Sequence, residues 1–147
     1  ITARDMDMGE IRRAASIACV DEAISDFAHG YDTVVGERGV TLSGGQKQRT
    51  AIARMLTQRA PIMVFDDSLS AVDAETDLKI RTQLKTHLGG STVILISHRV
   101  TTLMSADCIL VLDKGRVQQM GTHEELMAQE GIYRHIFNMQ MSSEVTA

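Results

Sequence analysis

The sequence predicts an α/β fold in which a helical part comes first and parallel strands follow. Two short apolar runs, Ile62–Phe65 and Thr92–Ile96, are typical of strands that are buried on both faces of a parallel sheet. The segment between them has helical spacing, so the three elements form a βαβ unit with an expected right-handed crossover. At 147 residues, with 44% hydrophobic and 23% charged residues, the chain is long enough for one globular domain with a buried core.

The N-terminal part of the chain carries helical patterns only. The first helix is predicted to begin at Asp7, because Asp7 and Glu10 have the spacing of a helix cap before an apolar stripe. A second, shorter helix is predicted with Asp21 as its cap. Together with the helix that starts after Ser43, these elements predict a helical subdomain over residues 1–60.

The helix after Ser43 begins with an unusual pair of glycines. Ser43 and Gln46 have the spacing of a capping box, and the helix has to end before Pro61. Gly44 and Gly45 each cost about 1 kcal/mol relative to alanine in a helix. They also remove side chains from the helix end at which free amides and the positive dipole point outward. Such an end suits a phosphate, although a capping box alone more often marks an ordinary helix start.

Four acidic or imidazole side chains follow the two predicted strands. Asp66 and Asp67 end the first strand, and adjacent carboxylates there repel each other unless water or a cation compensates them. Magnesium prefers one or two carboxylates together with waters and phosphates, while a solvated pair is the simpler interpretation of these two residues alone. Asp73 has the position of an N-cap for the next helix. His98 lies just past the second strand, where a lone histidine usually satisfies local hydrogen bonds.

The C-terminal part predicts a hairpin and two helices. Strands over 108–112 and 116–120 are expected to pair across a short turn, and a capping box at Thr122 opens the next helix. The last helix carries Ile132 and the apolar residues that follow it. Residues 142–147 are small and polar, which predicts a disordered tail.

Four motifs, in this order, resemble those of the ATP-binding domain of ABC transporters. The string LSGGQKQR resembles the signature motif of that family, IMVFDD its Walker B strand and SAVD its D-loop, and His98 has the place of its switch histidine. The resemblance covers nearly the whole chain. It implies that residues 61–141 are the C-terminal part of an ATPase core with ATP and Mg²⁺ as cofactors.

The resemblance also implies where the signature acts. ABC domains pair head to tail, so the signature would meet the γ-phosphate of an ATP molecule held by the P-loop of a second nucleotide-binding domain. The residues that would make this contact are Ser43, Gly44, Gly45 and Gln46.

Four further residues receive roles from the same resemblance. Asp66 would bind magnesium through water, Asp67 would align or deprotonate the attacking water, and His98 would contact the γ-phosphate. Asp73 would contact the other nucleotide-binding domain at the dimer interface, a role that is compatible with helix capping.

Asp67 departs from the family pattern, which usually has glutamate at this position. Aspartate is shorter by one methylene, about 1.5 Å. Because a misplacement of about 1 Å can cost 10²-fold in rate, we expect slow hydrolysis at the site that uses Asp67. The string DDSLSAVD resembles one subunit of heterodimeric multidrug or lipid exporters in which one ATP site is degenerate. A heterodimer is therefore favoured over a homodimer.

The P-loop of the family is missing from the sequence. No G-x-x-x-x-G-K-[ST] string occurs, so the resemblance implies a C-terminal portion that lacks the P-loop strand and the N-terminal β-subdomain. Ile1 in place of methionine agrees with a fragment of a longer chain. In the sheet order of this family, the missing strand would pair beside the apolar run 93–96. We therefore expect the isolated chain to fold poorly or to form domain-swapped dimers through this exposed edge. We also expect it to be inactive and to bind ATP weakly.

Composition and the resemblance together indicate which partners and which cellular location to expect. The net charge of −4 disfavours a nucleic-acid partner, and no run of about 20 apolar residues predicts a membrane span. Cys19 and Cys108 lack metal-ligand spacing and suit a reducing compartment. The strings GYDTVVGERGV and MGTHEEL resemble ABC exporters, which implies a place at the cytoplasmic face of the membrane, with Glu37 and Arg38 near the transmembrane domain.

The function predicted is therefore a part of the ATPase domain that powers export of small molecules or lipids. Two alternatives stay open at this point. One is a soluble ABC ATPase of repair or translation, and the other is a non-catalytic partner domain that only binds and gates.

Overall fold

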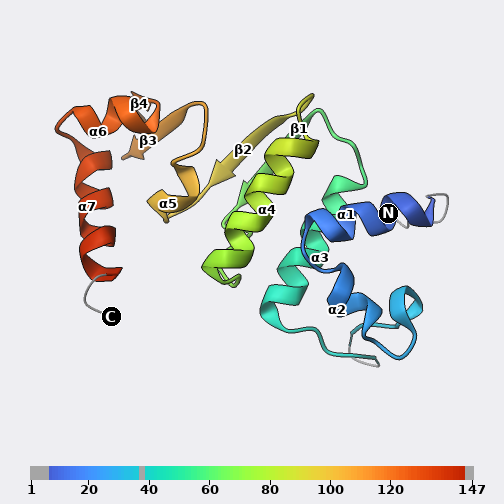
Figure 1. The fold of residues 1–147 in the computed structure, drawn as a ribbon. Helices are drawn as coiled ribbons and strands as arrows, with labels where there is room; N and C mark the ends of the chain where they lie inside the picture. The colour runs from blue at the N-terminus through green and yellow to red at the C-terminus, as the bar shows by residue number, and fades with distance from the viewer. Residues whose placement is uncertain (1–6, 37–38, 145–147) are drawn as a thin grey trace. The chain divides into compact units, whose positions relative to one another are not determined.

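The computed structural model describes residues 7–36 and 39–144, so the expected roles of Glu37 and Arg38 lie outside the described residues. The described residues form two compact units that divide between Ile94 and Leu95, and each is described by itself. The elements in chain order, shown in Figure 1, are α1 (Met8–Ile17), α2 (Asp21–Ser25), η1 (Gly30–Asp32), α3 (Gly44–Leu56), β1 (Ile62–Asp66), α4 (Ala74–His87), β2 (Thr92–Ile96), α5 (Val100–Leu103), β3 (Ile109–Asp113), β4 (Arg116–Gly121), α6 (His123–Ala128) and α7 (Ile132–Glu144).

Helices α1, α2 and α3 make up the N-terminal part of the first unit, and α1 contacts α2, α3 and α4. The apolar stripes that the sequence predicts face the core, with Ala14 and Ala15 of α1 and Ile52 and Leu56 of α3 buried. The caps differ from the prediction. Asp7 is the N-cap of α1 but its side chain makes no cap hydrogen bond. Similarly, the N-cap of α2 is Val20, so Asp21 is already inside the helix.

Strands β1 and β2 pair with each other, as the βαβ prediction requires. The amide of Thr92, at the start of β2, donates to the carbonyl of Pro61 just before β1 at 2.8 Å, which aligns the two starts as in a parallel pair. The prediction that both faces are buried is wrong for both strands. In β2, Ile94 and Ile96 are 45% and 50% exposed. In β1, one face is buried and the other is exposed. Met63 and Phe65 are buried, but Ile62 and Val64 are 60% and 52% exposed. Because side chains alternate across a strand, only one face of β1 packs into the core.

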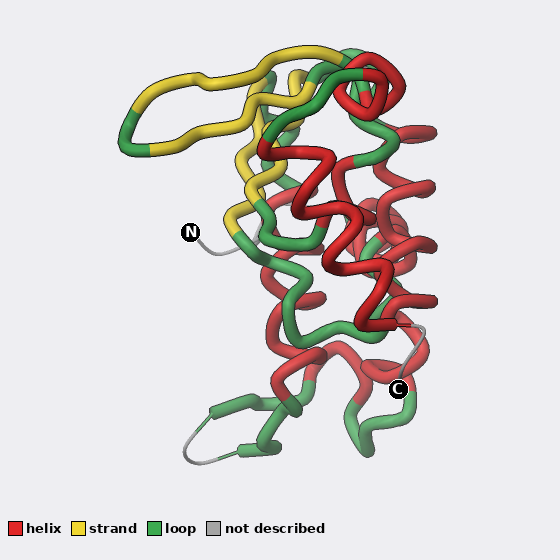
Figure 2. The backbone as a smooth tube through the Cα atoms, turned by 90° about the vertical axis from the view of Figure 1, so that its left-hand side faces the viewer, coloured by secondary structure: helices red, strands yellow, loops and turns green. Residues whose placement is uncertain are grey.

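The second unit is built on the hairpin β3–β4, which Figure 2 draws among the strands in yellow. Its turn has Lys114 and Gly115 at φ 49° and 73°, the left-handed pair that a two-residue hairpin turn requires. The register shifts by an irregularity between Val111 and Leu112. Helices α5, α6 and α7 close a small core, whose buried side chains are Val100, Ile109, Leu126 and Tyr133.

Two expectations for the C-terminal part have different outcomes. The capping box at Thr122 is confirmed, since its side chain accepts from the amide of Glu125 and the Glu125 carboxylate accepts from the amide of Thr122. Residues 142–144, expected in a disordered tail, instead continue α7. Ser142 lies within this helix, and its hydroxyl donates to the Asn138 carbonyl one turn earlier, at 2.7 Å. Residues 145–147 of the expected tail lie outside the described residues.

None of the helices within residues 7–36 and 39–144 is both long enough and apolar enough to cross a bilayer. The predicted border at residue 60, between a helical subdomain and an ATPase core, stays a prediction, since the division into compact units falls at a different place.

Candidate functional site

The first turn of α3 has the capped geometry that the sequence predicts. Ser43 is the N-cap in extended conformation, and its Oγ accepts from the Gln46 amide at 3.2 Å. The Gln46 side chain turns back, so that its Oε1 accepts from the Ser43 amide at 2.9 Å. The first amides of a helix have no acceptor within the helix, and the positive end of the dipole lies at the same place. This end of α3 is therefore suited to an anion.

The two glycines have different surroundings. A Cβ at Gly45 would lie 3.0 Å from the carbonyl oxygen of Ala71, whereas one at Gly44 would lie 3.7 Å from the Ala71 side chain, an ordinary contact. Gly45 is thus needed for the close approach of the 70–73 loop, a contact that the sequence does not reveal. The first turn of α3, which the sequence predicts to be free of side chains, is therefore covered on one side by this loop and open on the other.

Gln48 joins the same two segments and was not recognised from the sequence. Its Nε2 donates to the hydroxyl of Ser70 at 3.0 Å, and its Oε1 accepts from the amide of Ala71 at 3.0 Å. The available signal is its position one turn after Gly44, on the same side of the helix. The start of α3 and the 70–73 loop are therefore held together by one side chain.

Arg49 ties the start of α3 to the end of α1. Its Nη1 donates to the Cys19 carbonyl at 2.9 Å and its Nε donates to the Gly45 carbonyl at 3.3 Å. Cys19 has a φ of 53°, so the chain reverses there and turns this carbonyl toward the arginine. Burial raises the pKa of the Cys19 thiol, although nearby Arg49 acts in the opposite direction. The thiol is therefore held in its neutral form beside the guanidinium.

Asp66 and Asp67 lie exposed at the carboxyl end of β1. Asp67 has a φ of 46°, a left-handed conformation in which aspartate is enriched relative to most side chains. A turn follows, in which the Ser70 amide donates to the Asp67 carbonyl at 3.1 Å. Among the described residues there is no group of three or more His, Cys, Asp or Glu that could hold a metal ion. A pair of exposed carboxylates suits magnesium only if phosphate and water supply the other ligands.

Asp73 is the N-cap of α4, as predicted. Its Oδ1 accepts from the Thr76 amide at 2.9 Å. This hydrogen bond holds the pKa of the Asp73 carboxyl below its usual value, and Arg49 adds a smaller effect in the same direction. The dimer contact that the resemblance implies for Asp73 stays a prediction.

The lowered pKa gives Asp73 a defined pH dependence. With a pKa below that of the unfolded chain, the cap stabilises α4 above the unfolded value, and this contribution is lost as pH falls through the folded pKa. We expect the Thr76 amide resonance to titrate with a midpoint below the ordinary aspartate value of about 3.9. In Asp73→Asn, which caps without titrating, this step should vanish. A midpoint at or above the ordinary value would contradict the lowered pKa.

His98 belongs to the second unit and is exposed at the end of β2. Its main chain is hydrogen-bonded to α7, since the His98 carbonyl accepts from Nε2 of Gln140 at 2.7 Å. The structure thus brings the start of α3 and the 70–73 loop together within the first unit, whereas His98 belongs to the second unit.

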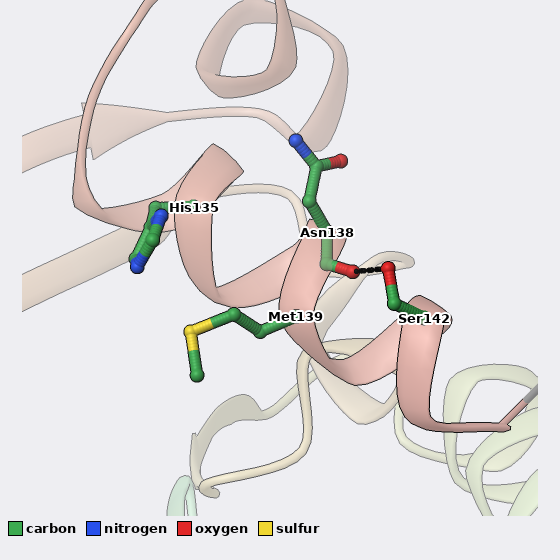
Figure 3. A pocket seen from close by; sticks show the side chains of 4 residues that line it. All are labelled: His135, Asn138, Met139 and Ser142. Atoms are coloured by element: carbon green, nitrogen blue, oxygen red, sulfur yellow. Dashed lines mark hydrogen bonds between the residues drawn. The ribbon is translucent and has the colours of Figure 1, made fainter. Parts of the chain in front are cut away.

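A hollow on α7 contains none of the predicted site residues. It has a volume of about 530 Å³, is open to solvent and is lined by His135, Asn138, Met139 and Ser142 of this single helix (Figure 3). The hydrogen bond drawn there joins Ser142 to the carbonyl of Asn138. Since no polar groups converge from a second element, this hollow does not have the form of a ligand site.

Comparison with known proteins agrees with the motifs. A family described as ABC transporter matches residues 3–70. An ATP-dependent lipid A-core flippase from Haemophilus ducreyi is 44% identical over 133 residues, which cover 90% of this chain and 23% of the flippase. The mitochondrial potassium channel ATP-binding subunit of Homo sapiens is 46% identical over 131 residues, which cover 89% of this chain and 18% of that protein.

A solved structure shows the same fold. A bacterial Atm1-family ABC exporter with ATP bound matches with a TM-score of 0.86 and 40% identity, over 92% of this chain and 24% of the exporter chain. The chain thus spans between 18% and 24% of the length of these three proteins. The likeness confirms the predicted α/β fold as a partial ATPase core. The chain therefore belongs to the ABC transporter family, of whose ATPase domain it is a part.

Proposed function

We propose that the complete protein uses ATP to export a small molecule or lipid, and that this chain contributes a signature to an ATP molecule bound on a second nucleotide-binding domain. The observation that carries the proposal is the start of α3. Its amide-bearing tip is held against the D-loop by Gln48 and by the close contact of Gly45 with Ala71. A rigid tip of this kind can place backbone donors around a phosphate without reorganising when ATP arrives.

The exporter part of the proposal is supported by the relatives. One is named a lipid A-core flippase and the structural neighbour an ABC exporter, so a soluble ATPase of repair or translation is not favoured. A lipid or another amphipathic molecule is accordingly the preferred cargo. The nucleotide-binding domain would lie at the cytoplasmic face of the membrane, with Glu37 and Arg38 in the loop that meets the transmembrane domain.

The carboxylates after β1 would serve the nucleotide held by this subunit. When bound, Mg²⁺ would neutralise phosphate charge, and Asp66 is the residue that would hold it, through water. Asp67 would orient the attacking water, and His98 would donate to the γ-phosphate. Asp73 would contact the second nucleotide-binding domain while it caps α4. The preferred assembly is a heterodimer, because Asp67 makes this subunit's own site the slower one.

The test is Asp67→Glu in the complete transporter, with the partner's Walker B site disabled so that only this subunit's site turns over. We expect the kcat for ATP to rise about tenfold or more, because the longer side chain restores the reach of a general base worth roughly 10²–10⁴. The left-handed backbone at Asp67 tolerates glutamate less well, which limits the gain.

The matched control is Asp113→Glu, the same change at the end of β3, which should leave ATP turnover unchanged. A turnover that responds neither to Asp67→Glu nor to Asp66→Asn would show that these carboxylates take no part in hydrolysis.

A further inference from the structure

Gln140 of α7 holds the main chain on both sides of His98. Its Nε2 donates to the His98 carbonyl at 2.7 Å, and its Oε1 accepts from the Val100 amide at 2.9 Å. Both contacts lie within the second unit, although Gln140 is 40 residues beyond Val100 in the chain. The carboxamide of Gln140 thus pairs with both the His98 carbonyl and the Val100 amide, the main-chain groups on either side of Arg99.

The start of α5 needs a partner of this kind. Its N-cap is Arg99, whose side chain makes no cap hydrogen bond, and the first amides of a helix cannot be satisfied within the helix. Gln140 supplies the acceptor for the Val100 amide from outside the helix. On the other side, the hydroxyl of Ser97 accepts from the Arg99 amide at 3.0 Å. The backbone that carries His98 is therefore fixed by side chains of a neighbour and of a distant helix.

The helix that carries Gln140 is itself anchored near this segment. Tyr133 of α7 is buried in the same core as Val100, and Phe137 packs against that core. The amide of Tyr133 also donates to the Gln119 side chain at 3.0 Å, which joins α7 to the hairpin. The helix that carries the carboxamide and the first residue of α5 therefore pack into one core, which keeps Gln140 close to the segment around His98.

We propose that Gln140 is a positioning residue for His98. The inference rests on the proposed function, in which the exposed His98 side chain contacts the γ-phosphate of ATP. Gln140 fixes the direction in which the imidazole leaves the main chain, and so keeps it in register with the phosphate. It touches neither ATP nor the reacting atoms.

The experiment uses the complete transporter with the partner's Walker B site disabled, so that only this subunit's site turns over, in every variant compared. The variant is Gln140→Met, a side chain of similar length that cannot make either hydrogen bond. We expect the kcat for ATP to fall about tenfold and the KM to stay within about twofold, because misplacement of a group that acts in the transition state lowers kcat. Gln140→Glu keeps an acceptor for the Val100 amide but has no N–H for the His98 carbonyl, so its kcat should be intermediate. The matched control is Gln129→Met, at an exposed position after α6, which should behave as wild type.

A double-mutant cycle separates positioning from general destabilisation. If Gln140 acts through His98, then Gln140→Met should cause little further loss in a His98→Ala background, so the two effects are not additive. Hydrogen exchange at the Val100 amide should also become faster in Gln140→Met, while exchange in the buried core around Tyr133 should be unchanged.

The outcomes distinguish the inference from the proposed function. If His98→Ala lowers turnover but Gln140→Met does not, or if both losses multiply in the double variant, the positioning role is overturned. If His98→Ala itself leaves turnover at the wild-type level, the role of His98 in the proposed function fails, and the positioning role fails with it. A raised KM with unchanged kcat in Gln140→Met would also overturn the proposal, since it would indicate an effect on nucleotide binding.

Discussion

Gly45→Val is expected to lower ATP turnover at the partner's site about 100-fold. A Cβ at this position already lies 3.0 Å from the Ala71 carbonyl, and valine adds two methyl groups beyond it. Since the nearest atom belongs to the backbone, the D-loop or the start of α3 has to move. A displacement on the order of 1 Å at a group that stabilises the transition state costs about 10²-fold. The kcat for ATP of the complete transporter, assembled with a wild-type partner, measures the effect.

The matched control for this change is Gly90→Val. Gly90 lies in the connection between α4 and β2, and no atom outside its chain neighbours lies within 4 Å of a Cβ there. Turnover of Gly90→Val should therefore equal that of wild type. If Gly45→Val also keeps wild-type turnover, the start of α3 is not a phosphate contact.

Ile80→Ala is expected to give the largest loss of stability in the first unit. Ile80 is fully buried on α4, and removing its side chain costs the burial of three carbon atoms together with the cavity that remains. Comparable truncations destabilise by about 2–5 kcal/mol. The free energy of opening, obtained from hydrogen exchange at the α4 amides of the complete protein, should fall by this amount.

Leu78→Ala is the control on the same helix. Leu78 is 57% exposed, and surface substitutions of this kind change stability by about 0.5 kcal/mol or less. If Ile80→Ala and Leu78→Ala lower the free energy of opening equally, then Ile80 is not packed in the core as the structure shows.

Local patterns predicted the elements well because their causes lie within a few residues. The strand Thr92–Ile96 is found at the predicted residues, and both capping boxes, at Ser43 and Thr122, form with the expected partners. The hairpin turn follows from the left-handed pair Lys114 and Gly115. Each of these features needs only one helix end or one turn.

The contacts that organise the site join residues distant in sequence, and these could not be predicted. Gln48 is hydrogen-bonded to Ser70 and Ala71, which lie 22 and 23 residues later in the chain. Gln140 is hydrogen-bonded to the amide of Val100, which lies 40 residues earlier. A glutamine on an amphipathic helix gives no sign of its partner. Likewise, an apolar run does not tell whether one or both faces of a strand are covered, which is why the burial of Ile62 and Val64 was overestimated.

The link between Gln48 and the 70–73 loop has a consequence for how substitutions compensate each other. The start of α3 and this loop are far apart in sequence but in contact, so a substitution that displaces one of them also displaces the other. In a transporter inactivated by Gly45→Val, second-site substitutions that restore activity should therefore occur preferentially at Ser70 or Ala71. A small shift of the loop away from α3 at these residues makes room for the valine side chain.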